Sequence, residues 1–349
     1  MQIPNLKLVF VLLGLMIVQN CKAQYNIEVL DSNTFTLDDG VVLSKTSFRG
    51  LSVVNDNTIW VSGSRGTFAR SVDGGKTFTY TQLKGYEKSD FRDIEAFDDK
   101  RAVMMSSGTP AYILKTTDGG LTWKEVYKNT DSAYFLDAMD FWDEQHGMIV
   151  GDPINGHFVL LETKNGGDTW HELDTTKTPH AMDGEAVFAA SGTSLRCWGK
   201  DEFGFVTGGT KSRLLIYSMN QFAEEKSNIQ SGKSYKGAFS FSRQDSFGFV
   251  VVGGDYICDS CVNKNSFIIS AETILNGYKI DVKGYRSCVE ILNSKTAISC
   301  GTTGTDLYNG KIWKSISSTP FHVVRKAKKG KAVYFAGPKG KIGRLVNSR

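Results

Sequence analysis

One pattern of residue types occurs seven times along the chain. Each copy begins with an aromatic or polar residue, continues through a strand of alternating polarity and a turn, and ends in an apolar strand close to a glycine. The first copy runs from Phe48 to Gly63, and the last runs from Phe321 to Gly337. Alternation with a period of two predicts β-strands that are buried on one side. The 36 glycines and 6 prolines fit many short strands joined by tight turns. The pattern therefore predicts an all-β protein.

Three of the repeats also contain a segment with the same order of residue types. These segments read SVDGGKTF, TTDGGLTW and TKNGGDTW and are centred on Asp73, Asp118 and Asn165. The three side chains are expected to cap turns by accepting backbone N–H groups, while each Gly-Gly pair supplies positive φ angles. Their period of about 45 residues indicates a repeated unit of four strands. We therefore expect Asp73, Asp118 and Asn165 to be structural.

Seven such units predict a seven-bladed β-propeller of four-stranded blades, formed as a single domain by residues 24–349. The last unit begins near residue 320 and is too short for four strands. The stretch from Asn26 to about Ser44 belongs to no repeat and is expected to be extended. If this stretch completes the last blade, the ring closes and no sheet edge stays open.

The first 23 residues have the features of a secretory signal peptide. Lys7 precedes an uncharged apolar run from Leu8 to Val18, and Ala23 precedes a polar residue. We predict cleavage after Ala23 and export to the periplasm, envelope or exterior; an uncleaved anchor and a lipid on Cys21 are the alternatives. The apolar run is too short to span a bilayer, and no later segment could do so.

The charge of the chain gives no reason to expect a nucleic-acid partner. The formal net charge is +4, and it falls to +2 without residues 1–23, which contain two lysines and no acidic residue. A nearly neutral protein has no bulk attraction to nucleic acid or anionic lipid.

Five cysteines follow the predicted signal peptide, so at least one is free or paired outside the chain. Cys288 and Cys300 flank a turn in a predicted hairpin and could face each other across the strands as a disulfide. Cys258 and Cys261 lie in a loop, where a plain disulfide or two free thiols is expected rather than redox or metal chemistry.

The repeats resemble the Asp box, or BNR repeat, which lies between the third and fourth strands of propeller blades. The pattern FRGL…WVSG…SVDGGKTF is similar to the photosystem II assembly or stability factor family, which has many exported bacterial relatives. The resemblance implies a scaffold that holds a protein partner, with basic residues near the central face as the contact. Sialidases and other glycosidases also carry Asp boxes, but Phe48-Arg49 and Phe91-Arg92 lack the proline of their arginine motif.

One residue of each repeat is expected at the mouth of the central channel. Taking the second residue of each repeat start gives Arg49, Arg92, Leu136, Glu185, Lys236, Arg286 and His322. Arginines in such a ring suit a carboxylate or phosphate. In the alternative interpretation they pair with nearby acids (Asp93, Glu95, Asp137 or Glu290) and form a neutral network.

The loops after the second strands should share this face. They contain Arg65, Tyr112, Asp152, His157, Asp255 and Tyr256. Asp152 and Asp255 hold matching positions, and paired carboxylates could serve acid–base chemistry. We expect these aspartates to cap their own loops instead.

The leading hypothesis is a monomeric, non-enzymatic binding scaffold without cofactor or metal. Its partner, a protein or an acidic ligand, would contact Arg49, Arg92, Lys236, Arg286, Arg65 and Tyr256. The alternative is a sialidase-like glycoside hydrolase or lyase that uses Asp152 and Asp255 on an acidic glycan.

Overall fold

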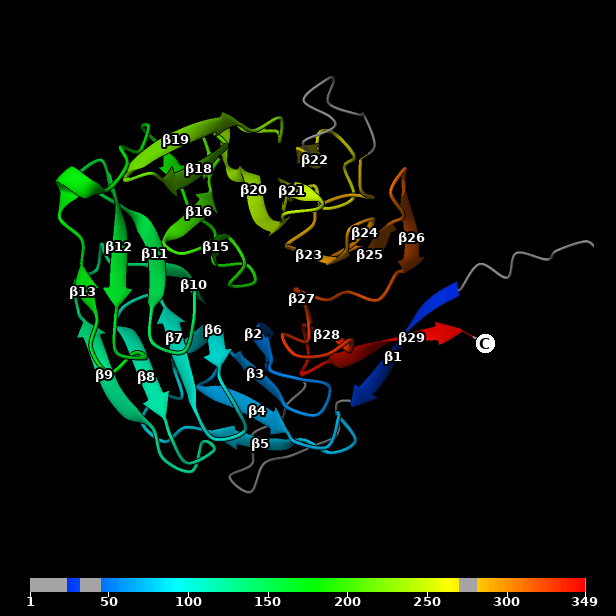
Figure 1. The fold of residues 1–349 in the computed structure, drawn as a ribbon, viewed down its shortest axis with the longest axis horizontal. Coiled ribbons are helices and arrows are strands. Elements are labelled where there is room, and N and C mark those ends of the chain that lie inside the picture. Colours follow the sequence, from blue (N-terminus) through cyan, green and yellow to red (C-terminus); the bar gives the residue numbers. More distant parts are fainter. Residues whose placement is uncertain (1–23, 32–44, 270–280, 349) are drawn as a thin grey trace, which may run out of the picture.

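In the computed structural model, seven antiparallel sheets stand around a central axis like the blades of a propeller (Figure 1). The structure describes residues 24–31, 45–269 and 281–348, and the predicted signal peptide lies outside them. The prediction of an all-β, seven-bladed propeller is confirmed. The described residues contain a 3-10 turn, Thr175–Lys177, and no helix among them is long and apolar enough to cross a bilayer.

The first three blades follow the chain from the innermost to the outermost strand. Blade 1 contains β2 (Phe48–Val53), β3 (Ile59–Gly63), β4 (Thr67–Ser71) and β5 (Thr79–Gln82). Blade 2 contains β6 (Asp90–Ala96), β7 (Ala102–Ser107), β8 (Ala111–Thr116) and β9 (Lys124–Asn129). Blade 3 contains β10 (Leu136–Phe141), β11 (Gly147–Ile154), β12 (His157–Thr163) and β13 (His171–Glu172).

Blades 4 to 6 follow the same order, with one extra pair of short strands. Blade 4 contains β15 (Leu195–Trp198), β16 (Glu202–Val206), β18 (Arg213–Ser218) and β19 (Gln221–Lys226). In blade 5, β20 (Lys233–Gln244), β21 (Gly248–Asp255) and β22 (Ser266–Ile269) are extended inward by β17 (Gly208–Gly209) and β14 (Glu185–Ala186). Blade 6 contains β23 (Cys288–Asn293), β24 (Thr296–Gly301), β25 (Gly304–Tyr308) and β26 (Trp313–Ser317).

The last blade joins the two ends of the chain. Strands β27 (Val323–Lys326), β28 (Val333–Ala336) and β29 (Ile342–Ser348) are completed by β1 (Gln24–Asp31), which pairs antiparallel with β29. Ile27 and Leu30 pack against a hydrophobic cluster shared by blades 6, 7 and 1. Residues 24–31 therefore close the ring, as predicted, while residues 32–44 of the predicted stretch lie outside the described residues.

The three Gly-Gly segments lie between the third and fourth strands of their blades. In blade 1 the Asp73 carboxylate accepts hydrogen bonds from Ser71 Oγ (2.8 Å), Thr77 N (3.0 Å) and Thr77 Oγ1 (2.6 Å). Gly74 and Gly75 have φ angles of 76° and 79°, which favour glycine. Asp118 and Asn165 hold equivalent turns in blades 2 and 3.

Aromatic side chains from these segments fill the spaces between blades. Trp123 of blade 2 packs edge-on against Phe68 and Trp60 of blade 1, with ring centroids 5.3 and 6.3 Å away. Trp170 of blade 3 lies in a cluster with Val103 of blade 2. Such burial of large apolar surfaces between sheets drives the assembly of the ring.

The ring has two faces that differ in which loops they carry. On one face the residues before each first strand bond to the connection between strands two and three, as in Ser64 N to Ser47 O (3.0 Å). We call this the arginine face, because Arg49 and Arg92 lie on it. On the opposite side, the turn face, the Gly-Gly segments bond to the turns after the first strands, as in Gly74 N to Asn57 O (3.0 Å).

Each blade is also linked to the next by a buried hydrogen bond between innermost strands or the segments next to them. The acceptors are mostly side chains: Ser52 for Ala96 N, Asp93 for Met139 N, Asp140 for Cys197 N, Ser240 for Val289 N and Cys288 for Val324 N. Backbone carbonyls complete the circle, with Thr193 O accepting from Phe241 N and Val53 O from Lys328 N. We call this circle the inner belt.

The pKa values of the aspartates in the Gly-Gly turns predict that the stability of the protein depends on pH. The hydrogen bonds from the following threonine lower the pKa values of Asp73 and Asp118 from 3.8 to about 2. A depressed folded-state pKa stabilises the protein above the unfolded-state value, and this contribution disappears as the pH falls to about 2. Asp73→Asn/Asp118→Asn should therefore unfold at lower temperature than the wild type at pH 7, and the difference should shrink between about pH 4 and 2.

Asn165 provides the control, because its amide already holds the same turn without a charge. Asn165→Asp should add a third pH-dependent contribution to the stability of the protein, as measured by thermal unfolding. A difference between wild type and double variant that is constant from pH 7 to pH 2 would contradict this explanation.

Candidate functional site

The mouth of the channel on the arginine face is set by a β-bulge in the innermost strand. In four blades the pairing skips one residue: Arg49, Arg92, Asp137 and Phe239. In blade 1, Gly63 lies against Phe48, the residue before the bulge. Gly301 of blade 6 lies against Arg286 in the same way, and Gly337 of blade 7 lies against Phe321. The equivalent residues there are consequently Ser287 and His322.

The predicted ring is thus right for Arg49, Arg92 and His322 and wrong for the other positions. Leu136 precedes the bulge and is fully buried in the core, so Asp137 takes its place. Glu185 lies in β14, where its carboxylate binds Arg213 Nε at 2.8 Å. A bulge shifts the register by one residue, which reverses the side that a side chain faces.

Arg286 and Lys236 are also displaced from the mouth. Arg286 is fully buried: Nε and Nη2 donate to Asp306 Oδ2 at 2.9 and 2.6 Å, and Nη1 donates to Thr303 Oγ1 at 2.7 Å. Lys236 lies in β20 with its ammonium 3.4 Å from Asp255 Oδ2. Arg286 is therefore structural and not available to a partner.

A segment that connects β14 to β15 fills the channel at this level. Its residues 187–194, which we call the plug, contact the innermost strands or adjoining loops of five other blades. The contacts are Arg49 to Ala190 O, Arg92 to Ala189 O, Val187 N to Asp152, Thr193 Oγ1 to Ser240 Oγ and Ser191 Oγ to Ser287 O. A segment that touches so many blades must lie on the axis, and its buried serines and threonine supply the polar partners needed there.

Arg49 and Arg92 come together above the plug. Arg49 Nη1 donates to Ala190 O at 3.1 Å, and Arg92 Nη1 donates to Ala189 O at 3.2 Å. Arg92 also pairs with Asp90 at 2.8 Å. Burial and the neighbouring Arg92 lower the pKa of Arg49. The two guanidinium groups are therefore close enough to repel each other and are held in place by backbone carbonyls.

Other groups at the mouth leave this positive charge in place. Burial, together with Arg49, Arg92 and Lys341, lowers the pKa of His322 to about 3, so the imidazole is neutral at pH 7. Burial and the neighbouring Asp152 raise the pKa of Asp137 well above its usual range, which disfavours its negative charge. Lys341, from the connection between β28 and β29, adds a third cation.

The acids proposed in the neutral-network interpretation mostly serve other partners. Asp93 accepts Met139 N in the inner belt, and Glu290 binds Arg196 at 3.0 Å. Glu95 binds Lys328 and lies 3.8 Å from Arg325. Asp137 lies near Arg92, whose charge partly offsets the rise in the pKa of Asp137.

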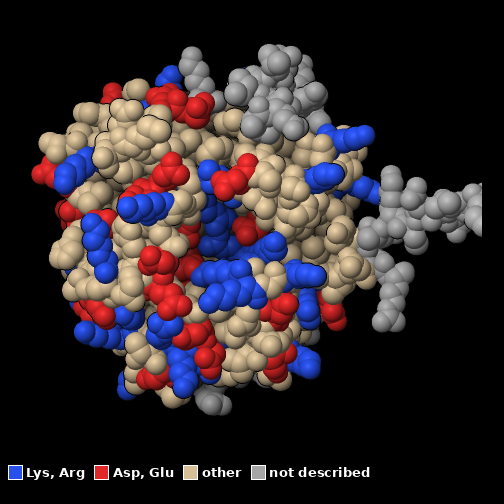
Figure 2. Space-filling view, viewed as in Figure 1, with Lys and Arg blue, Asp and Glu red and all other residues tan. Residues whose placement is uncertain are grey.

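That neutral network exists at the other end of the channel. On the turn face a pocket of about 390 Å³ is lined by Glu95, Asp140, Arg196, Glu290, Arg325 and Lys328, among others. Basic and acidic side chains lie side by side around the hollow at the centre of the ring (Figure 2). Because these charges pair with each other, we interpret the pocket as the polar filling of the channel.

The other residues expected on the arginine face have diverse environments. Arg65 is exposed in the connection between β3 and β4, and Tyr112 lies in β8 against Tyr86. The imidazole of His157 lies against His180, with ring centroids 4.1 Å apart. Tyr256 is 49% exposed and packs against Phe239.

Asp152 and Asp255 do not share a partner. Asp152 accepts Val187 N at 3.0 Å, and burial raises its pKa to about 6. Asp255 accepts the N–H groups of Ile257 and Cys258, each at 2.9 Å, and binds Lys236. Each carboxylate fixes a loop, the role expected for it. Among the described residues no group of His, Cys, Asp and Glu side chains could hold a metal ion.

The predicted Cys288–Cys300 disulfide is not formed. The two residues face each other across β23 and β24, but both thiols are free. Cys288 Sγ instead lies 3.3 Å from Val324 O and 3.4 Å from Val324 N, because it serves in the inner belt. The disulfide of the described chain joins Cys258 and Cys261, and Cys197 is also free.

The sequence interpretation missed the plug, Lys341 and Phe239. The plug had a signal, since the interval between Glu185 and Phe205 is longer than the matching interval in other repeats. Lys341 follows the second strand of the last repeat and could have been found by the rule applied to the other loops. The position of Phe239 at the mouth depends on the β-bulge in β20, which the alternating sequence pattern does not reveal.

The position of Arg286 makes a prediction about stability. Arg286→Ala leaves Asp306 as a buried, unpaired charge, so the free energy of unfolding should fall by about 3–5 kcal/mol. Denaturant unfolding measures the change. A matched variant, Arg286→Met/Asp306→Leu, removes both charges and should lose much less. A loss below about 1 kcal/mol for Arg286→Ala would contradict a structural role.

Comparison with protein families finds a match within the repeats. Residues 82–183 match the model of the family described as photosynthesis system II assembly factor YCF48. A curated relative, the vacuolar protein sorting/targeting protein 10 of Pyricularia oryzae, is 27% identical over 176 residues. That alignment covers 49% of this chain and 11% of the relative.

Solved structures share the whole architecture. The structure of YCF48 bound to D1 peptide has a TM-score of 0.62 at 14% identity and covers 93% of this chain and 98% of its own. YCF48 from Cyanidioschyzon merolae has a TM-score of 0.59 at 12% identity, with 91% and 98% covered. Together with the family match over residues 82–183, these findings confirm the predicted resemblance to propellers of the photosystem II assembly factor type, and the seven blades confirm the shared fold.

Proposed function

We propose that this propeller is an exported, non-enzymatic scaffold that holds an acidic segment of a protein partner on its arginine face. The observation that carries the proposal is the pair of guanidinium groups of Arg49 and Arg92 at the channel mouth, anchored by the carbonyls of the plug. Within the described chain, Asp90 is the one carboxylate that forms an ion pair with either of them.

The geometry leaves hydrogen-bonding capacity for a ligand. A guanidinium has five N–H donors, and Arg49 uses one of them in a hydrogen bond to the described residues. Bidentate binding of a carboxylate to a fixed guanidinium is strong and directional. Because the plug already holds the side chains, little rotamer entropy is lost when a partner binds.

The comparisons support a protein as the partner. One propeller of similar fold has been solved as YCF48 with a D1 peptide bound. The surroundings of the arginine pair suit a peptide, since Phe135 lies 6.0 Å below Arg92 and Phe188 stacks on Phe239 at 4.0 Å. The roles of Asp152 and Asp255 in fixing loops favour a scaffold over a hydrolase.

Export is supported by two independent features. Residues 1–23 have the order of a signal peptide, and the Cys258–Cys261 disulfide is typical of an oxidising compartment.

The test is binding of fluorescent peptides of acidic, neutral and basic composition to the protein lacking residues 1–23. Acidic peptides should bind, and Arg49→Gln/Arg92→Gln should weaken them about tenfold or more, since charge-assisted hydrogen bonds are lost. The plug is also held through Val187, Ser191 and Thr193, so it should stay in place and the melting temperature should change little.

Lys76→Gln/Lys100→Gln is the matched control, because both lysines are exposed on the turn face and the change in charge is the same. This variant should bind like the wild type. Equal binding of acidic and neutral peptides, or equal loss in both variants, would refute the proposal.

A further inference from the structure

The connection between β21 and β22 is unusually long for this face. It spans residues 256–265, whereas blades 1, 3 and 6 make the same connection with residues 64–66, 155–156 and 302–303. A long connection on a compact propeller is a common place for a binding element. We call residues 255–265 the stapled loop.

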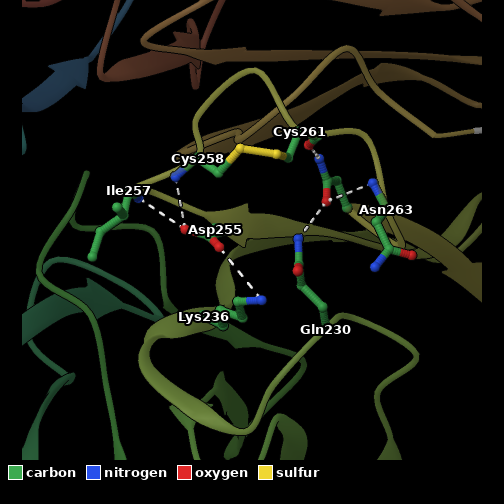
Figure 3. Close-up of a disulfide and its surroundings, with 8 residues drawn as sticks. Gln230, Lys236, Asp255, Ile257, Cys258, Cys261 and Asn263 are labelled. Atoms are coloured by element: carbon green, nitrogen blue, oxygen red, sulfur yellow. Dashed lines mark hydrogen bonds and ion pairs between the residues drawn. A yellow bond between two sulfur atoms is a disulfide. The ribbon is translucent and has the colours of Figure 1, made fainter.

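The stapled loop is held in one conformation by covalent and polar contacts. The disulfide links Cys258 to Cys261, whose Cα atoms are 5.3 Å apart, and Asp255 accepts two N–H groups at the start of the loop (Figure 3). At its end, Asn265 Nδ2 donates to Cys261 O at 2.7 Å, and Asn265 Oδ1 accepts from Gln230 at 2.9 Å. Asp259 O accepts from Tyr285 N at 2.7 Å.

This fixed loop presents apolar side chains to solvent. Ile257 is 67% exposed, Val262 57% and Tyr256 49%. They are three of the nine large hydrophobic side chains exposed in the described residues. Scattered exposed apolar residues need no explanation, but a cluster on a stapled loop is typical of an interaction site.

An aromatic cluster, in which Phe239 and Tyr285 are buried, connects the stapled loop to the plug. Tyr256 lies edge-on to Phe239, with ring centroids 6.1 Å apart, and Phe239 lies edge-on to Tyr285 at 4.7 Å. Phe239 also stacks on Phe188 of the plug at 4.0 Å. Ala190 of the plug belongs to the same cluster, and its carbonyl accepts a hydrogen bond from Arg49 Nη1. The cluster therefore fixes the stapled loop beside the plug, so the exposed apolar side chains of the loop lie on the same face as the arginine pair.

We infer that the stapled loop is the specificity-determining half of the docking surface and binds apolar side chains that lie next to an acidic group in an extended segment of the partner protein. Charge complementarity selects this occupant, because Arg49, Arg92 and Lys341 require an anion and the loop requires apolar groups. The inference rests on the proposed function. Lys236 and Asp255 neutralise each other beneath the loop, so the loop itself adds apolar contact rather than charge.

The test compares two synthetic peptides, one with an acidic group alone and one with the same group followed by leucine and phenylalanine. The wild type should bind the second peptide about tenfold more tightly or better, since burial of two such side chains contributes several kcal/mol before ordering costs. Ile257→Ser/Val262→Ser should remove this advantage and leave the affinity for the acid-only peptide unchanged. Leu121→Ser/Ile312→Ser changes two other exposed apolar residues, which lie on the turn face, and should behave like the wild type.

A second variant tests the staple. Cys258→Ser/Cys261→Ser should reduce the preference for the apolar peptide without changing the affinity for the acid-only peptide. Without the disulfide the loop is more flexible, so it loses more conformational entropy when the apolar residues bind. The inference is overturned if the acid-only peptide binds and the apolar residues add nothing, or if Ile257→Ser/Val262→Ser weakens both peptides equally. If the acid-only peptide does not bind the wild type at all, the proposed function itself has failed.

Discussion

The inner edges of seven sheets meet at the axis of this molecule, and their backbone N–H groups have no further strand to bind. An unpaired buried N–H costs about as much as a lost hydrogen bond, so each must find an acceptor. The inner belt supplies acceptors from the neighbouring blade, with Ser52, Asp93 and Ser240 among them. The rest of the structure depends on this constraint, because it fixes the spacing of the blades and demands polar groups along the channel.

The plug meets the same need for polar partners at the axis, close to the arginine face. Its serines and threonine bind the inner strands of blades 5 and 6, while its carbonyls anchor Arg49 and Arg92. The arginine pair is thus positioned by the plug inside the channel. The turn-face pocket, where Arg196 pairs with Glu290, shows the alternative of full charge compensation. One molecule therefore has a neutral mouth and a cationic mouth on the same axis, which explains why only the arginine face suits an acidic partner.

Much of the fold could be predicted from the sequence because the signals are local. Turn residues such as Asp73 act within a few positions, and their spacing indicated a four-stranded unit. The strand pattern that occurs seven times indicated the number of blades, and the short last unit indicated that the N-terminal stretch completes it. The mouth was predicted less well. Leu136 and Arg286 were misplaced because a bulge or a one-residue offset is not visible in an alternating pattern, and Cys288 was misassigned because its role depends on Val324 in another blade. The plug acts through contacts far apart in the chain, which periodicity does not encode.

The central claim is that the arginine pair, held by the plug, receives an acidic group of the partner. A crystal structure of the protein with a bound acidic peptide tests it most directly. The account predicts a carboxylate within hydrogen-bonding distance of both Arg49 and Arg92, with their bonds to Ala190 and Ala189 retained. A peptide bound in the turn-face pocket, or a carboxylate that contacts neither arginine, would contradict it.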